Sequence, residues 1–261
     1  MARLVKSPQL RQVLAYCAED PVERVFLEDV ARRGVGRFAA LEEGGRLVAL
    51  CHMGSNLVPS GRDTAAFADA ASLSRPRMIV GKEGDVTELW EAIERRMPEP
   101  LDDRPGQPVY VTQAPPPPGE SGLRAATLAD LPMLVPACAA AYFEEVGVDA
   151  HSRDPALSEW RTRSQIQHDR SWLWTEGGRI LFKAEASAWT PQVVQLQQVW
   201  VEPDLRNRGY AKRALADLLA LLLERTATVC LFVRPENEPA IRLYEALGMR
   251  ETISYRSLIF S

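Results

Sequence analysis

A glycine among cationic side chains marks one place where this sequence could bind an anion. Gly209 lies in PDLRNRGYAKRAL (203–215), which carries three arginines and a lysine although the chain has a net charge of −4. The segment separates an apolar strand-like run from an apolar helix-like run. Free backbone N–H groups at a helix start carry partial positive charge, and a glycine lets a phosphate approach them. The segment therefore predicts a phosphate site; a nucleic-acid contact and a solvated helix start are the alternatives.

The residues around this junction predict the elements that would position it. Residues 209–225 have apolar positions at helical spacing, while 192–201 and 228–233 are rich in β-branched residues, so a crossover helix joins two parallel strands. Further strands are expected at 123–125, 171–175, 179–189 and 251–260, and further helices at 127–145, 155–169 and 237–247. The order is strand, two helices, three strands, helix, strand, helix, strand. It predicts an α/β (α+β) fold with a mixed sheet.

Two segments match a pair of blocks conserved in a known family. Arg206, Gly209 and Ala211 fit the pattern [QR]xxGx[GA] as RNRGYA, and the preceding VWVEP (199–203) resembles the strand that enters this loop in the family. NEPAIRLYEALGM (237–249) is similar to the second block, NxxAxxxYxxxGF. Residues 122–261 thus resemble the GNAT superfamily of acyl-CoA N-acyltransferases. The resemblance implies a GNAT fold with acetyl-CoA as co-substrate.

The resemblance also implies roles for individual residues. The pyrophosphate of acetyl-CoA would bind backbone amides of Arg206, Asn207, Arg208, Gly209, Tyr210 and Ala211. Its pantetheine arm and thioester carbonyl would contact main-chain groups of Val199, Trp200 and Val201, with a hydrogen bond to the arm from Asn237. Tyr244 matches the general acid that protonates the departing thiolate. A packing role for Tyr244 and a helix N-cap role for Asn237 are the alternatives.

The general base must come from outside the strand at 192–201. Family members often carry a glutamate there, whereas this strand offers only glutamines, which cannot accept a proton at neutral pH: Gln195, Gln197 and Gln198. Glu185 on the neighbouring strand is the first candidate, provided that its side chain faces the cleft. Glu144 and Glu145, at the end of the first helix, come second, and a water chain is a further option. All three glutamates could instead be surface carboxylates.

The proline-rich segment APPPPG (114–119) divides the chain. It can neither continue a helix nor pair as a central strand, so it predicts an extended connector. We expect an N-terminal domain at 1–113, a linker at 114–121 and a catalytic GNAT domain at 122–261.

The N-terminal domain repeats part of the second half in outline. Residues 36–51 predict a hairpin, and 78–80 predict a strand followed by a glycine turn and a helix, without an arginine-rich loop. GSNLVPSG (54–61) predicts a turn, or a cleft lining at Asn56. The arrangement resembles bacterial two-part chains in which such a domain precedes a GNAT domain. We expect a degenerate GNAT-like domain that no longer binds CoA.

Composition excludes several classes of protein. No apolar run approaches the length of a spanning helix or of a secretory leader, so a cytoplasmic protein without membrane contact is expected. A pI of 5.6 argues against general nucleic-acid binding. The cysteines and histidines are scattered, which predicts no metal site and buried, reduced thiols in apolar surroundings at Cys17, Cys51, Cys138 and Cys230.

The sequence therefore predicts an N-acetyltransferase, an acyltransferase that needs no covalent enzyme intermediate. A primary amine of a small molecule, peptide or protein would attack acetyl-CoA directly. The alternative from another class is a non-catalytic acyl-CoA-binding regulatory module, which the missing strand glutamate favours. Neither the amine nor the oligomeric state follows from the sequence.

Overall fold

The C-terminal half (residues 122–261) has the predicted order of elements. A computed structural model describes residues 2–147 and 154–260 of the chain. The elements of this half are β7 (Leu123–Ala125), the 3₁₀ turn η3 (Leu128–Asp130), α5 (Leu131–Val146), α7 (Pro155–Gln167), β8 (Ser171–Glu176), β9 (Arg179–Trp189), β10 (Val193–Trp200), η4 (Pro203–Leu205), α8 (Tyr210–Leu223), β11 (Thr228–Phe232), α9 (Glu238–Ala246) and β12 (Arg250–Ile259). Strands β10 and β11 are parallel, whereas β9 and β10 are antiparallel. The predicted mixed α/β fold is confirmed.

The N-terminal half (residues 1–113) follows the same order. Its elements are β1 (Arg3–Lys6), α1 (Leu10–Cys17), α2 (Val25–Arg32), β2 (Phe38–Glu43), β3 (Arg46–Met53), β4 (Asn56–Gly61), η1 (Thr64–Phe67), α3 (Ala68–Ser72), β5 (Met78–Lys82), α4 (Glu83–Ile93), η2 (Glu94–Arg96) and β6 (Asp102–Thr112). It too reads strand, two helices, three strands, helix, strand, helix, strand. The parallel pair β4 and β5 stands where β10 and β11 stand in the other half. The two halves are therefore repeats of one fold.

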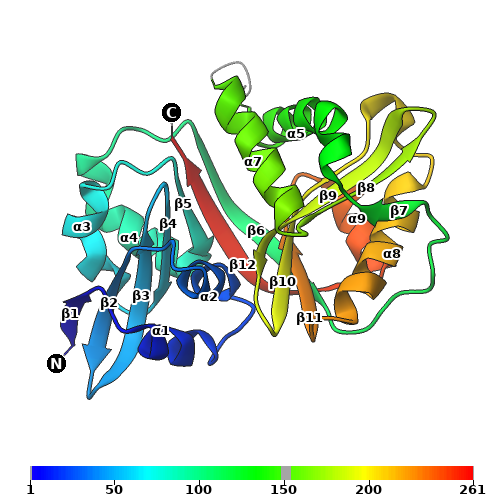
Figure 1. Cartoon of the computed structure of the whole chain (residues 1–261). Coiled ribbons are helices and arrows are strands. Elements are labelled where there is room, and N and C mark those ends of the chain that lie inside the picture. The colour runs from blue at the N-terminus through cyan, green and yellow to red at the C-terminus, as the bar shows by residue number, and fades with distance from the viewer. Residues whose placement is uncertain (1, 148–153, 261) are drawn as a thin grey trace.

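The last strand of each half lies in the sheet of the other half. The strands form one twelve-stranded sheet in the order β1-β2-β3-β4-β5-β12-β6-β11-β10-β9-β8-β7. Strand β12 pairs with β5 of the N-terminal half, β6 pairs with β11 of the C-terminal half, and the two exchanged strands pair with each other. Figure 1 shows β12 ending beside the N-terminal half. Since the sheet is continuous, the division into domains at 114–121 stays a prediction.

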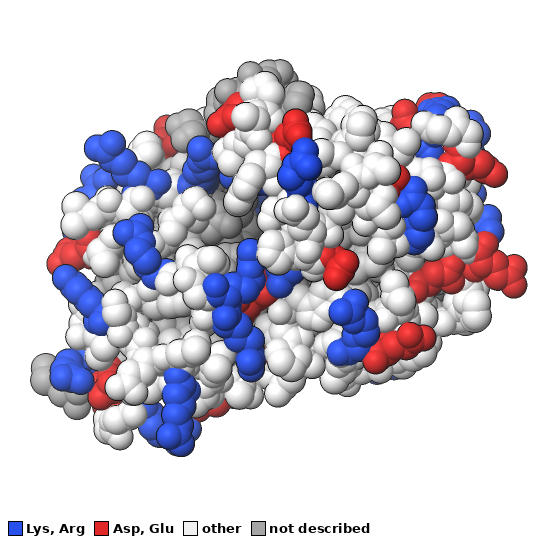
Figure 2. Space-filling model, in the orientation of Figure 1, with Lys and Arg blue, Asp and Glu red and all other residues white. Residues whose placement is uncertain are grey.

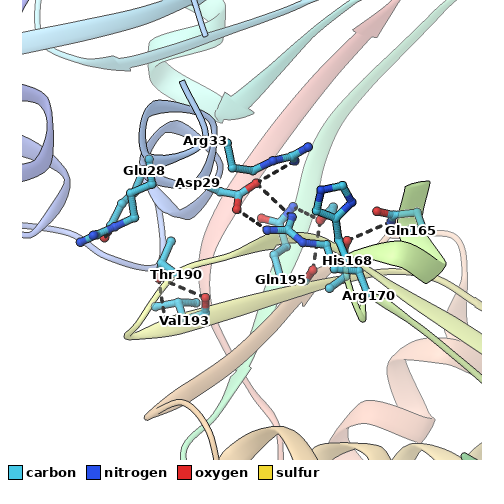
Figure 3. A network of polar contacts seen from close by, with 12 residues as sticks. Glu28, Asp29, Arg33, Gln165, His168, Arg170, Thr190, Val193 and Gln195 are labelled. Atoms are coloured by element: carbon cyan, nitrogen blue, oxygen red, sulfur yellow. Dashed lines mark hydrogen bonds and ion pairs between the residues drawn. The ribbon is translucent and has the colours of Figure 1, made fainter. Parts of the chain in front are cut away.

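A helix of the N-terminal half covers part of the other half's sheet. Helix α2 packs on β9 and β10, and its Asp29 accepts two hydrogen bonds from Arg170, with N···O distances of 2.5 and 3.1 Å (Figure 3). Arg33 adds a third contact to Asp29, at 3.5 Å. Both the Asp29 and Arg170 side chains are buried, so removing one partner would leave an uncompensated charge, at a cost of about 3–5 kcal/mol.

Local signals in the sequence explain several boundaries. Thr127 and Asp130 form the expected capping box. Gly147 ends α5 at φ 75°, and the turn between β8 and β9 uses two glycines with positive φ, as a tight hairpin requires. The helix predicted at 127–145 begins as the 3₁₀ turn η3, and α5 then continues through Pro136.

Two expectations about the N-terminal half and the cysteines need correction. Residues 54–61 were expected to form a turn, but most of them form strand β4. Pro59 fits there because β4 pairs with β5 only at Asn56 and Leu57, so its missing N–H breaks no bond to β5. The four cysteines are free and buried as predicted, yet Cys138 is not in apolar surroundings, since its Sγ donates to Glu185 Oε1 at 3.0 Å.

The proline-rich segment is held against α8. Asp217 accepts hydrogen bonds from the backbone N–H groups of Gly119 and Ser121, at 2.7 and 2.8 Å. Arg213 Nε donates to Gly119 O at 2.9 Å. A Cβ on Gly119 would meet Arg213 O at 1.9 Å, so only glycine permits this approach. Arg213 therefore helps to fix the connector.

Candidate functional site

Strands β10 and β11 separate where the sequence predicts the thioester site. They pair only over residues 193–195 and 228–230, and no pairing between them is recorded beyond Gln195 in the part of the chain that the structure describes. Opposite β9, the register of β10 shifts between Gln197 and Trp200, and Gln198 has a φ of 50°. This bulge leaves main-chain groups near Val199 outside the regular ladder. Backbone donors and acceptors are therefore free to meet a ligand between the strands.

The predicted phosphate loop opens onto solvent. Residues 206–209 are exposed, and Gly209 is the N-cap of α8 with a φ of 82°. A Cβ on Gly209 would meet no atom within 4 Å, so the space above the helix start is open. The first N–H groups of α8 and the positive end of its dipole face this space. An anion can therefore approach these N–H groups without meeting protein atoms at Gly209.

The side chains around the loop have other partners. Arg206 Nε donates to Val201 O at 3.1 Å, and its Nη2 lies 2.5 Å from Glu144 Oε2. Asn237 caps α9 by accepting from the Ala240 N–H at 3.3 Å, so its expected N-cap role is confirmed. Arg206 thus joins the phosphate loop to the end of α5, while the backbone of 206–211 remains the part available to a phosphate.

Tyr244 lies on α9, within the large hydrophobic cluster of the C-terminal half. Its side chain is buried, and its ring centroid lies 5.8 Å from that of Tyr110 on the exchanged strand β6. Burial raises the pKa of the Tyr244 phenol well above its ordinary value, and the nearby charge of Glu145 adds to the rise. Tyr244 therefore carries its proton at neutral pH.

Glu185 faces the α5 and α7 side of the sheet but is enclosed. Lys183 Nζ lies 3.1 Å from Glu185 Oε1 and 2.6 Å from Gln198 Oε1, and the Lys183 side chain is fully buried. Burial alone would raise the pKa of Glu185, but the Lys183 charge and the Cys138 hydrogen bond outweigh it and lower the pKa. A weakly basic carboxylate without solvent access suits a structural ion pair better than a proton acceptor. Lys183 also holds the β10 bulge through Gln198.

The two glutamates at the end of α5 differ from each other. Glu144 accepts from Trp200 Nε1 at 3.2 Å and pairs with Arg206. Glu145 is exposed, yet protein surrounds its carboxylate closely enough that desolvation raises its pKa, opposed by the charges of Arg104, Lys183 and Arg234. A carboxylate with a raised pKa on an exposed residue is the kind of group that takes a proton from an amine. Figure 2 shows a hollow in the molecular surface between the N-terminal half and the region of α7.

Sequence reasoning missed the partners that define these environments. Lys183 stands two residues before Glu185 in the apolar strand RILFKAEASAW, and a lysine in such a strand was a usable signal for a buried pair. Arg104 and Tyr110 gave no such signal, because they reach the site only through the strand exchange.

The corresponding loop of the N-terminal half is filled by its own carboxylates. After β4, the Gly61 N–H donates to Asp85 Oδ2 at 2.8 Å and the Thr64 N–H donates to Glu88 Oε2 at 3.0 Å. Both acids lie on α4. They occupy backbone donors in the loop that follows β4, where a phosphate would need them, and their negative charge would repel one.

Other kinds of site receive no support. Within residues 2–147 and 154–260, no cluster of three or more His, Cys, Asp or Glu side chains could hold a metal ion. In the same ranges, no helix combines the length and apolar character needed to cross a membrane. His151 lies outside the described residues.

Two family models match the chain. The first is a domain of unknown function, DUF4081, over residues 36–134, and the second is the acetyltransferase (GNAT) family over residues 138–249. No curated protein matches significantly.

Solved structures resemble nearly the whole chain. A GNAT-family acetyltransferase from Colwellia psychrerythraea has a TM-score of 0.60 at 10% identity, with 99% of this chain and 100% of that chain covered. A GCN5-related N-acetyltransferase from Sphaerobacter thermophilus gives 0.58 at 16%, covering 98% and 94%. A tandem GNAT protein from the clavulanic acid biosynthesis pathway gives 0.59 at 12%, covering 99% and 98%. These likenesses concern the fold. The family model thus matches residues 138–249 to the acetyltransferase (GNAT) family, and the likenesses show that the whole chain has the fold of two-part GNAT proteins.

Proposed function

We propose that the chain transfers the acetyl group of acetyl-CoA to a primary amine by direct attack. Acyl transfer is the chemistry of the family that residues 138–249 match. The observation that carries the finer proposal is the separation of β10 from β11 directly before the open helix start at Gly209. A strand gap next to an anion-binding helix start suits an extended thioester with a pyrophosphate at its far end.

Acetyl-CoA would be held mainly by backbone. Residues 206–211 would receive the pyrophosphate, and Val199, Trp200 and Val201 would contact the pantetheine arm and the thioester carbonyl. Donors fixed by the β10 bulge would stabilise negative charge as it develops on the carbonyl oxygen, without reorganising. Asn237 would offer its side-chain amide to the arm.

Glu145 is the base in this proposal, in preference to Glu185 and Glu144. It combines solvent access with a raised pKa, whereas Lys183 neutralises Glu185 and Arg206 pairs with Glu144. The amine nitrogen attacks the carbonyl carbon as Glu145 takes its proton. The resulting oxyanion collapses and breaks the C–S bond.

Tyr244 gives its proton to the departing thiolate. Its raised pKa keeps the phenol protonated until then, and the burial that raises this pKa also destabilises a thiolate beside it. The proton taken by Glu145 returns to Tyr244 through solvent, so the enzyme ends unchanged. The acceptor is a small-molecule, peptide or protein amine.

Calorimetry and thiol release test the proposal. Titration with acetyl-CoA should give binding, and a panel of amines should include one that releases free CoA thiol. Glu145→Gln should lower that release by about 100-fold or more, as for loss of a general base, with little change in acetyl-CoA affinity. Glu185→Gln tests the other candidate base, with folding checked by circular dichroism because the variant leaves Lys183 buried without its partner.

A second candidate is a regulatory module that binds acyl-CoA without turnover. The neutralised Glu185 and the glutamines of β10 favour it. Tight acetyl-CoA binding with no thiol release across a broad amine panel would support this module and exclude the enzyme. Absence of acetyl-CoA binding would exclude both.

A further inference from the structure

An arginine of the exchanged strand β6 reaches the end of α5. Arg104 Nη2 donates to the backbone oxygen of Glu145 at 2.7 Å, and its Nε donates to Asp102 Oδ2 at 2.6 Å. The Arg104 side chain is only 10% exposed. A residue of the N-terminal half thus contacts the helical turn that carries Glu144 and Glu145.

The end of a helix needs such a contact. The last carbonyl groups of α5 have no partner within the helix and carry partial negative charge, so a guanidinium there satisfies and stabilises them. Arg234 makes the matching contact from the C-terminal half, donating to Glu144 O at 3.2 Å. Two arginines, one from each half, therefore hold the final turn of α5.

The charges around Glu145 come from several elements. Burial raises the pKa of Glu145, and three positive charges oppose this rise. The largest opposing effect comes from Arg104 on β6, followed by Lys183 on β9 and Arg234 after β11. Glu185 on β9 acts in the opposite direction, and Glu145 in turn raises the pKa of Tyr244 on α9.

We propose that Arg104 is a positioning residue for Glu145, so that the N-terminal half completes the acceptor side of the site in the C-terminal half. The inference rests on the proposed role of Glu145 as the base. Arg104 fixes the turn through its hydrogen bond and adds a positive charge close to the carboxylate. A C-terminal half without β6 lacks both contributions.

Carboxyl NMR tests the contact independently of turnover. In protein labelled with ¹³C at the glutamate carboxyl, Glu145→Gln assigns the Glu145 signal. Arg104→Gln should raise the titration midpoint of that signal, because it removes a positive charge that lowers the pKa of Glu145. Arg104→Lys keeps the charge and should bring the midpoint back most of the way. Arg256→Gln is the control. It removes an arginine of β12 that pairs with Asp103, the neighbour of Arg104 on β6, and should leave the Glu145 midpoint unchanged.

Kinetics then separate this inference from the proposed function. In an active chain, Arg104→Gln should move the low-pH limb of the rate profile to higher pH by as much as it moves the NMR midpoint, with acetyl-CoA affinity within about two-fold of wild type. An unmoved Glu145 midpoint, or an unmoved limb in an active variant, overturns the inference. A moved midpoint in a chain that releases no thiol supports the contact and overturns the proposed function alone.

Discussion

Replacing Lys183 with methionine should destabilise the protein in a strongly pH-dependent way. Lys183 is fully buried, and its Nζ lies 3.1 Å from Glu185 Oε1, so the variant leaves a buried carboxylate without its counter-charge. Protonation of Glu185 is the way for the folded state to remove this unpaired charge at the lowest cost in free energy. Holding a glutamate of ordinary pKa protonated costs about 4 kcal/mol at pH 7 but only about 1 kcal/mol at pH 5. These values are upper limits, because Cys138 and Gln197 still donate to the carboxylate.

The direction of the pH effect follows from proton counts. In the wild type, the folded-state pKa of Glu185 is lowered, so the pair adds stability above the unfolded pKa and loses it as the pH falls. In Lys183→Met the folded-state pKa lies above the unfolded value. The folded state then binds more protons, and stability rises as the pH falls from 7 to 5. The variant should therefore be closest to the wild type in mildly acidic solution.

Urea unfolding at pH 7 and pH 5 measures both effects. The double variant Lys183→Met/Glu185→Met leaves no unpaired charge at this position and should regain most of the loss at pH 7, since replacing a buried ion pair by apolar side chains is often neutral. Equal losses of Lys183→Met at the two pH values would refute the reasoning. So would a double variant no more stable than the single one.

Three further predictions concern acetyl-CoA. Tyr244→Phe should lower thiol release by about 100-fold with acetyl-CoA affinity nearly unchanged; full activity would dismiss Tyr244 as the acid. Gly209→Glu should weaken calorimetric acetyl-CoA binding at least about 10-fold more than Gly209→Ala, because both variants strain the backbone at φ 82° but only the glutamate repels a phosphate. Equal weakening would count against the phosphate loop. Calorimetry should also give one acetyl-CoA per chain, since Asp85 and Glu88 occupy the N-terminal loop, and a value near two would contradict that account.

The C-terminal elements could be predicted because their signals are local. Apolar spacing in 209–225, β-branched runs on either side and glycines at Gly147 and Gly178 mark boundaries within one or two residues of those observed. The same signals misled at β4, where Pro59 reads as a strand breaker. Strand β4 tolerates Pro59 because its pairing with β5 ends at Leu57, and this end point is set by tertiary structure rather than by local sequence.

Strand β6 shows what local signals cannot supply. Its sequence DDRPGQPVYVT contains two prolines and a glycine, and both of its partners, β11 and β12, lie more than a hundred residues away. No strand was expected there. The phosphate loop and the acid are each predicted from one segment, whereas the choice of base depends on which charges surround three glutamates. Those charges include Arg104, so the choice among Glu185, Glu144 and Glu145 needed the structure.

The strand exchange gives the N-terminal half a structural role in the C-terminal half that needs no phosphate site of its own. Its β6 covers the edge of β11, its Tyr110 packs on Tyr244, and its Arg104 holds the turn of Glu145. Helix α2 adds the buried pair of Asp29 and Arg170 on the same sheet face. If the C-terminal half were produced alone, β11 would present an unpaired edge and the proposed acid would lose its aromatic neighbour. The N-terminal half therefore contributes to the site through structure, even with its own loop closed by Asp85 and Glu88.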